Sequence, residues 1–289
     1  MSLRRTMLFI PGNNPGMLQN GGVFGADSVI LDLEDAVAPQ EKDAARFLVA
    51  QALKTVDYGT SEKVVRINPL DTFGAKDIQM IVPCQPDVLL VPKVESAQDI
   101  EDVTQLVAQA EMAGQKPVQL IALLETARGI ALAYQIAETK GRLAALALGA
   151  EDYTAGLGAT RTKEGREIFT ARSLVINAAA AAGIQSLDTP FTDANDEAGL
   201  YQDTLTGKEL GFQGKLAINP RQIDVIHGVL NPTTAMVEWA EEVVQAIRKA
   251  ESEGSGVASL HGKMVDAPIV ARAEHILQLA RKLGVEVMQ

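Results

Sequence analysis

Short apolar runs recur along the chain, and each is followed by a longer stretch with the periodicity of an amphipathic helix. The runs are apolar without alternation, which is typical of parallel strands that are buried on both faces. The expected strands are Met7–Ile10, Ser28–Leu33, Lys63–Ile67, Val88–Val91, Gln119–Leu124, Ala144–Leu148, Ile184–Leu187 and Gly214–Ile218. About eight strands that alternate with helices predict an α/β fold, a closed (β/α)8 TIM barrel.

The stretches between the runs carry helix start and stop signals. Serine is a favoured N-cap, and glycine is favoured just beyond the last turn of a helix. The expected helices are Gln40–Val56, a helix capped by Ser96 that runs through Ala113, Thr170–Ala182 followed by Gly183, and Asp193–Leu210 followed by Gly211.

The pattern changes after the eighth expected strand. A long amphipathic helix is predicted over Thr234–Ser252, a flexible break over Glu253–Gly256, and a final helix over Asp266–Leu283. This tail exceeds what a barrel requires. We therefore expect a catalytic barrel domain over residues 1–230 and a C-terminal helical lid or intersubunit arm over residues 231–289.

Composition and charge exclude several classes of function. The chain is 47% hydrophobic and 22% charged, which is ordinary for a globular protein, and its formal net charge is -11. Lys and Arg are not concentrated in any segment, which argues against nucleic acid as a partner. The apolar stretches are too short for a membrane span or a signal peptide, so we expect no membrane association and a cytoplasmic location. Cys84 is the single cysteine, so an intrachain disulfide is excluded.

Charged and amide side chains stand at the end of almost every expected strand. The carboxyl ends of the strands in a parallel barrel carry the chemistry, so these side chains should converge on one rim. They are Asn13, Asp32, Glu34, Asp35, Arg66, Asn68, Lys93, Glu125, Glu151, Asp152, Asp188 and Asn219.

Glu125 and Asp152 are the candidate metal ligands. Each follows an apolar run, and neither has a Cys or His nearby, which suits a hard cation such as Mg²⁺. Mg²⁺ takes one or two carboxylates and completes its octahedron with waters and substrate oxygens. The alternative is that one of the two acids only caps the helix that follows it. By strand alternation Glu151 should point away from the metal.

Arg66 is the candidate anion-binding group, because its guanidinium can grip a carboxylate through two hydrogen bonds. The alternative is an internal ion pair with Asp32 or Glu34, which share one face of their strand. One of these two acids can orient Arg66. Gly12 and Gly214 are expected to allow close approach of the backbone to a ligand, although neither lies in a phosphate or dinucleotide motif.

Six motifs, in order over essentially the whole chain, resemble the citrate lyase β branch of the HpcH/HpaI aldolase and citrate lyase superfamily. They are Arg5–Gly12, Leu31–Asp35, Val65–Asn68, Leu148–Tyr153, Gly214–Ile223 and Gly262–Asp266. The resemblance implies a TIM barrel with a C-terminal lid, dependence on Mg²⁺, and cleavage of a (3S)-citryl-thioester to oxaloacetate and an acetyl-thioester.

The resemblance also assigns roles to individual residues. It implies that Arg66 binds a substrate carboxylate, that Glu125 and Asp152 bind the metal, and that Glu125 also touches the substrate. Asp266 is favoured as a plain helix N-cap by its position before an expected helix. The resemblance instead implies an acid/base aspartate that reaches the site of a neighbouring subunit from the lid.

Further expectations concern the thioester and the partners. Lys215, Asn219 and Pro220 lie where the resemblance implies that a pantetheine arm is received, and Asp32 is counted with the substrate-binding residues. The implied partners are an acyl carrier protein subunit and an acyl-transferase subunit of a citrate lyase complex, or free CoA thioesters. A homotrimer or homohexamer is implied as well.

Three alternatives remain open at this point. The first is a free-standing malyl-, methylmalyl- or citramalyl-CoA lyase or thioesterase of the same superfamily. The second is an aldolase that acts on free 2-keto acids, and the third is a non-catalytic assembly subunit.

Overall fold

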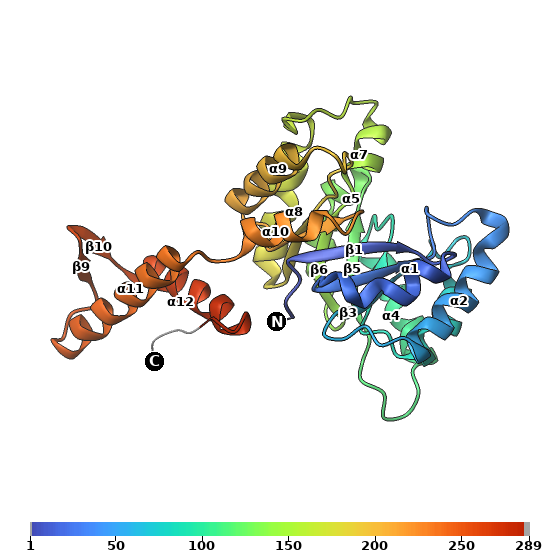
Figure 1. Ribbon diagram of the computed structural model, residues 1–289, viewed down its shortest axis with the longest axis horizontal. Coiled ribbons are helices and arrows are strands. Elements are labelled where there is room, and N and C mark those ends of the chain that lie inside the picture. The colour runs from blue at the N-terminus through green and yellow to red at the C-terminus, as the bar shows by residue number, and fades with distance from the viewer. Residues whose placement is uncertain (1, 286–289) are drawn as a thin grey trace. The chain divides into compact units, whose positions relative to one another are not determined.

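The computed structural model describes residues 2–285, and its first unit is a closed barrel of eight parallel strands in sequence order (Figure 1). The barrel closes between β1 and β8, where Met7 is paired with Leu216. The strands are β1 (Thr6–Pro11), β2 (Ser28–Asp32), β3 (Glu62–Arg66), β4 (Val88–Val91), β5 (Gln119–Leu124), β6 (Leu143–Leu148), β7 (Gln185–Asp188) and β8 (Gly214–Ala217). The predicted (β/α)8 fold is confirmed.

Alternate residues of each strand face two different layers. One set fills the barrel interior and includes Met7, Ile30, Val64 and Leu123. The other set, which includes Leu31, packs between the strands and the surrounding helices. The barrel is therefore a packed core, and any cavity must lie beyond its filled interior, at one of its ends.

The helices of this unit cover the outside of the barrel. They are α1 (Pro15–Asn20), α2 (Lys42–Thr55), α3 (Gly74–Ile81), α4 (Ala97–Ala110), α5 (Ala127–Ala131), α6 (Ala133–Ala137), α7 (Ala150–Leu157), α8 (Phe169–Ala182), α9 (Glu197–Leu210) and α10 (Gln222–Leu230). Short 3₁₀ turns cover Gly21–Phe24, Pro39–Glu41, Val82–Cys84 and Arg166–Ile168.

The predicted N-cap serine and the predicted C-terminal glycines lie at the helix ends where they were expected. Ser96 caps α4 and accepts from the N–H of Asp99, whose carboxylate in turn accepts from the N–H of Ser96. Gly183 and Gly211 end α8 and α9 with φ of 69° and 117°, a conformation that costs glycine little. The start of α9 differs from the prediction, because Asp196 rather than Asp193 is its cap.

Gly12 and Gly214 allow close approach between neighbouring segments of the chain. A Cβ on Gly12 would lie 2.5 Å from the carbonyl oxygen of Asp32, and a Cβ on Gly214 would lie 1.8 Å from that of Arg4. Both distances are shorter than contact distances, so glycine is required here for the strands to pack. The expected role of these two glycines at a ligand does not follow from their surroundings.

The second unit begins at Asn231, where the predicted domain boundary also falls. It consists of α11 (Thr234–Ser252), the antiparallel hairpin of β9 (Ala258–Leu260) and β10 (Lys263–Val265), and α12 (Ala267–Lys282). It has an apolar core of its own, in which Val243 of α11 packs with Ala273 and Leu277 of α12. The hairpin was not predicted, because each of its strands has only three residues.

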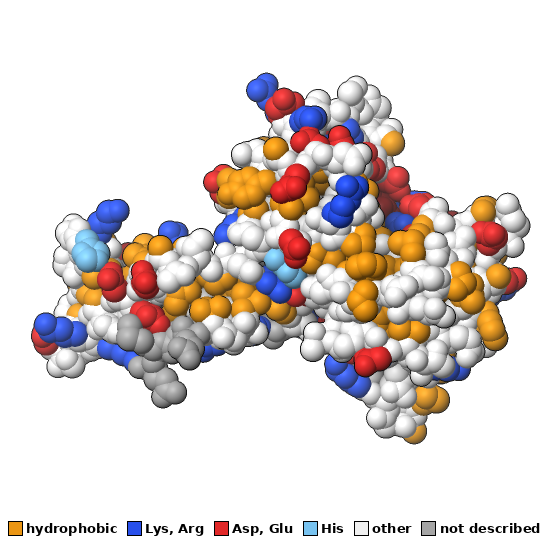
Figure 2. All heavy atoms as spheres, in the orientation of Figure 1, with side chains coloured by type: hydrophobic (Ala, Val, Ile, Leu, Met, Phe, Trp, Pro, Cys, Tyr) orange, Lys and Arg blue, Asp and Glu red, His pale blue; other side chains and the backbone are white. Residues whose placement is uncertain are grey.

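Within residues 2–285, each helix is either too short or too polar to traverse a lipid bilayer. On the face seen in Figure 2, the described Lys and Arg side chains are interspersed with Asp and Glu and form no continuous basic patch.

Candidate active site

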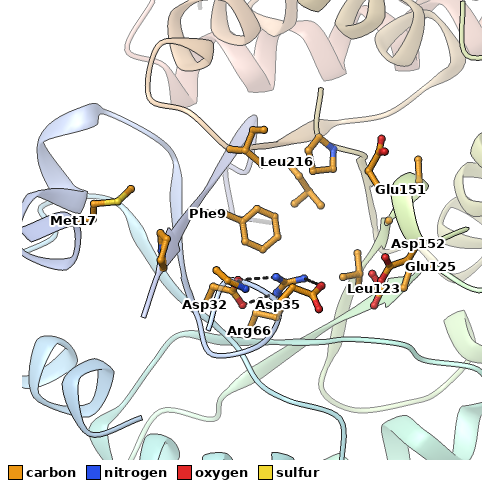
Figure 3. A pocket seen from close by; sticks show the side chains of 16 residues that line it. Phe9, Met17, Asp32, Asp35, Arg66, Leu123, Glu125, Glu151, Asp152 and Leu216 are labelled. Carbon is orange, nitrogen blue, oxygen red and sulfur yellow. Dashed lines mark hydrogen bonds and ion pairs between the residues drawn. The ribbon is translucent and has the colours of Figure 1, made fainter. Parts of the chain in front are cut away.

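A cavity of about 470 Å³ opens at the carboxyl ends of the barrel strands (Figure 3). Phe9, Asp32, Arg66 and Glu125 reach it because each lies two residues beyond a side chain of the barrel interior. The described residues that line it are Phe9, Pro11, Met17, Asp32, Asp35, Ala36, Arg66, Leu123, Glu125, Gly149, Ala150, Glu151, Asp152, Pro190, Leu216 and Ile218.

Glu125 is a buried carboxyl group that follows β5. Only 4% of the residue is exposed, and its Oε1 accepts a hydrogen bond of 2.8 Å from the backbone N–H of Lys93. Burial, and after it the charges of Glu34 and Asp152, raise the pKa of Glu125 to about 8. A buried carboxyl with negative neighbours is stabilised in its ionised form by a bound cation.

Asp152 and Glu151 line the same cavity from the first turn of α7. The apolar run of β6 ends at Leu148, and the chain turns into the helix directly after Gly149. The expectation that Glu151 points away by strand alternation is wrong, because neighbouring helical residues are only about 100° apart. Glu151 is held by Arg161, whose Nε donates to its Oε1 over 2.9 Å.

Asp32 holds Arg66 through a bidentate ion pair. Its Nε and Nη2 each donate over 2.7 Å to one oxygen of the Asp32 carboxylate. Its Nη1 lies 2.9 Å from Glu34 and 3.3 Å from the half-exposed carboxylate of Asp35. The guanidinium also lies over the ring of Phe9, 4.8 Å from its centre. The internal ion pair that was the alternative for Arg66 is thus present, with both Asp32 and Glu34.

Asp32 positions Arg66 and has little capacity left for a ligand. Besides the arginine, its two oxygens accept from the backbone N–H groups of Glu34 and Ala36, at 2.9 Å and 3.2 Å. Burial lowers the intrinsic pKa of Arg66, but the hydrogen bonds and charge of Asp32 outweigh it, so the pKa of Arg66 is raised overall. Arg66 is therefore permanently charged and rigidly oriented at the wall of the cavity.

Lys93 contacts both Glu125 and Glu34. The sequence placed it at a strand end but assigned it no role. It adopts a left-handed backbone conformation, with φ of 51°, which is strained for a lysine. In this conformation its N–H meets Glu125, and its ammonium lies 3.0 Å from Glu34. Burial raises the pKa of Glu34, while Arg66 and Lys93 act in the opposite direction.

The available oxygen ligands suit a hard cation that takes only a few ligands from the protein. Among residues 2–285, no group of three or more His, Cys, Asp and Glu side chains is close enough to hold an ion by itself. The cavity instead offers the two carboxylates of Glu125 and Asp152. This matches Mg²⁺, which takes one or two carboxylates and fills its remaining positions with water and substrate oxygens.

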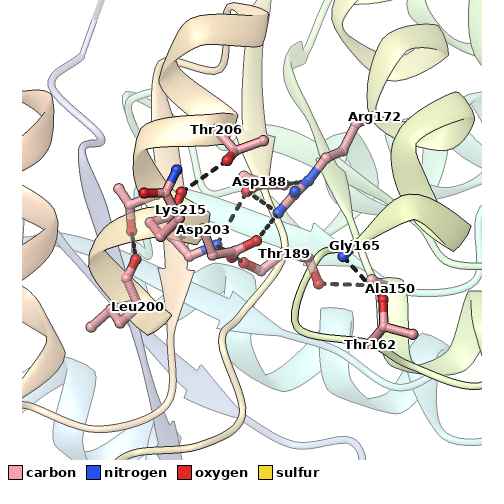
Figure 4. A network of polar contacts seen from close by, with 12 residues as sticks. Ala150, Thr162, Gly165, Arg172, Asp188, Thr189, Leu200, Asp203, Thr206 and Lys215 are labelled. Carbon is pink, nitrogen blue, oxygen red and sulfur yellow. Dashed lines mark hydrogen bonds and ion pairs between the residues drawn. The ribbon is translucent and has the colours of Figure 1, made fainter. Parts of the chain in front are cut away.

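Lys215 does not reach the cavity, contrary to the expected contact with a pantetheine arm. Since Leu216 faces the barrel interior, Lys215 faces the helices, where it is 1% exposed (Figure 4). Its ammonium donates to Asp188 at 3.1 Å, to Asp203 at 2.6 Å and to the carbonyl of Thr189 at 2.7 Å. Asp188 also points away from the cavity, because its neighbour Leu187 faces the barrel interior and strand side chains alternate.

Asn219 and Pro220 lie outside the described lining of the cavity. Asn219 and Pro220 follow Ile218, which does line the cavity, and the side chain of Asn219 accepts from the N–H of Arg221 at 3.0 Å. Asp266 belongs to the second unit, where it caps α12 and accepts from the N–H of Ile269. The N-cap interpretation of Asp266 is confirmed, and its catalytic role stays a prediction.

A parallel (β/α)8 barrel with two carboxylates and a clamped arginine at its catalytic end defines a class, the metal-dependent barrel enzymes. The family model described as HpcH/HpaI aldolase/citrate lyase matches residues 5–220. The chain belongs to this family.

Relatives match over nearly the whole chain. Citrate lyase subunit beta of Leuconostoc mesenteroides subsp. cremoris is 48% identical over 282 residues, covering 96% of this chain and 93% of its own. Mitochondrial citramalyl-CoA lyase of Mus musculus is 33% identical, covering 97% and 87%. Among solved structures, protein CitE of Mycobacterium tuberculosis in complex with magnesium, acetoacetate and coenzyme A is 31% identical with a TM-score of 0.80, covering 97% and 99%.

Proposed function

We propose that this chain is a Mg²⁺-dependent lyase that cleaves a citryl-thioester to oxaloacetate and an acetyl-thioester. The observation that carries the proposal is the pairing of Glu125 and Asp152 with the clamped Arg66 in one cavity. The 48% identity to a citrate lyase subunit beta supports the substrate, and the related structure with magnesium and coenzyme A supports the metal and the thioester.

Glu125 and Asp152 would hold the metal. Bound there, Mg²⁺ would act as a Lewis acid toward the hydroxyl and carboxylate oxygens of the 2-hydroxy-acid part of the substrate. Within this site the raised pKa of Glu125 means that the metal must displace a proton from that carboxyl.

Arg66 would bind a carboxylate of the substrate and fix its orientation. Asp32 occupies Nε and Nη2. Nη1 lies 2.9 Å from the buried Glu34, while its contact to the half-exposed Asp35 is longer, at 3.3 Å. A substrate carboxylate would take the place of Asp35 at this nitrogen. A guanidinium fixed in advance loses little freedom on binding, so its contribution goes into orientation.

Asp266 is proposed to supply the proton that the thioester enolate takes up after the carbon–carbon bond breaks. In the reverse direction it would remove that proton from the methyl group. The support for this role is the family resemblance around Gly262–Asp266, and the structure adds that Asp266 caps α12. Asparagine caps a helix about as well as aspartate, so the two roles can be separated by substitution.

The partners follow from the same proposal. As a citrate lyase β subunit the chain would work with an acyl carrier protein subunit and an acyl-transferase subunit. The second candidate function is a free-standing lyase for CoA thioesters, which the 33% identity to citramalyl-CoA lyase favours. The trimer or hexamer and the cytoplasmic location stay predictions.

The test is a keto-acid release assay with Mg²⁺ and, separately, citryl-CoA, malyl-CoA and citramalyl-CoA. Preferential release of oxaloacetate from citryl-CoA that is abolished by EDTA supports the proposal, and preference for another thioester favours the second candidate. No activity with the three CoA thioesters, but activity with citryl-loaded acyl carrier protein, would support a subunit of a citrate lyase complex.

Two variants test the ligands. Glu125→Ala and Asp152→Ala should each abolish the Mg²⁺-dependent turnover while the circular dichroism spectrum stays unchanged. Full activity of either variant would refute its assignment as a metal ligand. Inactivity of the wild type toward all of these substrates, together with no binding of Mg²⁺, would instead favour the non-catalytic subunit.

A further inference from the structure

The helix that carries Asp152 has no side-chain cap from its own N-cap residue. Gly149 occupies the N-cap position of α7, and glycine has no side chain with which to cap. A side chain at position 149 would collide with Glu125. Since the packing of Glu125 excludes Ser, Thr, Asp and Asn from this position, the first N–H groups of α7 need an acceptor from elsewhere.

Thr189 supplies that acceptor from the end of β7. Its Oγ1 accepts a hydrogen bond of 3.0 Å from the backbone N–H of Ala150, the first residue of α7 (Figure 4). Both residues are fully buried, so water does not compete for this bond. A buried N–H without a partner is costly, and Thr189 is therefore the group that fixes the start of α7 against the barrel.

Thr189 is itself held by a buried cluster of charges behind the barrel wall. Lys215 donates to its carbonyl oxygen at 2.7 Å, and the same ammonium is bound to Asp188 and Asp203. The Nη2 of Arg172 pairs with both of these aspartates, at 2.8 Å from Asp188 and 2.6 Å from Asp203. Two cations and two anions balance one another, so this cluster is a fixed anchor rather than a ligand site.

We infer that Thr189 is a positioning residue that holds the first turn of α7, and with it the carboxylates of Glu151 and Asp152, at the wall of the cavity. The connection runs from Lys215 through the carbonyl and hydroxyl of Thr189 to the N–H of Ala150. The consequence for metal affinity rests on the proposed role of Asp152 as a ligand. The consequence for the order of α7 does not.

Thr189→Val tests the inference, because valine keeps the shape and removes the acceptor. Thr189→Ser keeps the acceptor and should behave as the wild type. Thr204→Val is the matched control, since Thr204 is also buried and its hydroxyl donates to the carbonyl of Leu200 within α9. Thr189→Ala removes the acceptor without adding a methyl group and serves as a second variant of the same kind.

Two measurements on the full chain decide the matter. The first is amide hydrogen exchange of the start of α7 in metal-free protein, which should be faster by at least about tenfold in Thr189→Val and Thr189→Ala, and unchanged in Thr189→Ser and Thr204→Val. The second is the Kd for Mg²⁺ alone by calorimetry, which should weaken by about 10- to 100-fold in the same two variants, as for other groups that orient a ligand.

The outcomes separate the two proposals. Unchanged exchange in both Thr189→Val and Thr189→Ala overturns the inference, as does equal acceleration in Thr204→Val. Faster exchange with no Mg²⁺ binding by the wild type supports the positioning of α7 and refutes the metal site. Faster exchange with an unchanged Kd for Mg²⁺ supports the anchor but overturns its link to Asp152.

Discussion

Glu125 and Gly149 pack against each other at the ends of β5 and β6, so closely that only glycine fits. A Cβ at position 149 would lie 2.6 Å from the Cβ of Glu125 and 2.7 Å from its Oε2. Real atoms do not approach this closely without a shift of the chain. The proposed metal ligand therefore determines which residue begins the next helix, and that helix carries the second ligand, Asp152.

Gly149→Ala should weaken metal binding by displacing Glu125 or the start of α7. We expect the Kd for Mg²⁺ to rise by about tenfold or more and the stability to fall by about 1–3 kcal/mol, the usual range for overpacking. Calorimetry and chemical denaturation measure the two effects. The control is Gly156→Ala in the same helix, where, apart from the adjacent residues and the backbone of the helix itself, no described atom lies within 4 Å of an added Cβ. A Gly149→Ala protein with wild-type affinity for Mg²⁺ would show that Glu125 and α7 can accommodate the added methyl group without disturbing the site.

Much of the fold could be predicted because buried parallel strands are recognisable in the sequence as short apolar runs. The expected bounds of β4 and β5 agree with the structure to the residue. The direct entry of the chain into α7 after Leu148 could not be predicted, since Gly149 is required there by its contact with Glu125, a residue distant in sequence.

The site was predictable to the extent that it depends on strand ends, and it was missed where direction depends on register. Arg66 and Glu125 were found because each lies at or just after the end of a strand, two residues beyond a side chain of the barrel interior. Lys215 was misplaced, because the side that it faces is known only once Leu216 is known to point inward. Thr189 gave no signal in the sequence, since a single threonine after a strand is ordinary.

The metal-free protein should lose stability as the pH rises toward 8. Burial, together with the charges of Glu34 and Asp152, raises the pKa of Glu125 from 4.5 to about 8, so between these values the folded protein holds a proton that the unfolded chain has released. The contribution of this group is thus full below the unfolded pKa and is lost as the pH rises through the folded pKa, at up to about 1.4 kcal/mol per pH unit. Glu34, whose pKa is raised as well, adds to the same slope.

Urea denaturation of the metal-free protein across this pH range measures the slope. Glu125→Gln should reduce it, because the amide has no proton to release, and the reduction should be largest near neutral pH. A slope that is identical in the two proteins would mean that Glu125 titrates near its ordinary pKa. Saturating Mg²⁺ should reduce the slope in the wild type, since the metal stabilises the ionised carboxyl.

Magnesium affinity should depend on pH in the opposite direction to stability. Because the metal must displace the proton of Glu125, the apparent affinity should increase by about tenfold per pH unit below the folded pKa and level off above it. Calorimetry at several pH values, in buffers of different ionisation enthalpy, also counts the proton released. An affinity that is flat with pH would show that Glu125 is already ionised or does not bind the metal.

Arg66→Lys should impair turnover far more than folding. Lysine keeps the charge beside Asp32 and Glu34 but cannot reproduce the two-pronged pair or the fixed direction of Nη1. We expect kcat/KM to fall by about 10²-fold or more, with little change in the Kd for Mg²⁺. Arg66→Ala would leave buried carboxylates without a partner and should also cost about 3–5 kcal/mol of stability. Near-normal kinetics of Arg66→Lys would reduce Arg66 to an internal counter-ion.

Asp266→Asn separates the cap of α12 from proton transfer. Asparagine is as good an N-cap as aspartate, so α12 and the thermal stability should be unchanged, and so should the Kd for Mg²⁺. Turnover should fall by about 10²- to 10⁴-fold, the usual contribution of a positioned general acid or base. The specific measurement is exchange of the methyl protons of acetyl-CoA with deuterated water, in the presence of Mg²⁺ and oxaloacetate. Loss of this exchange with intact metal binding would assign the proton to Asp266, whereas exchange at the wild-type rate would leave it as a cap alone.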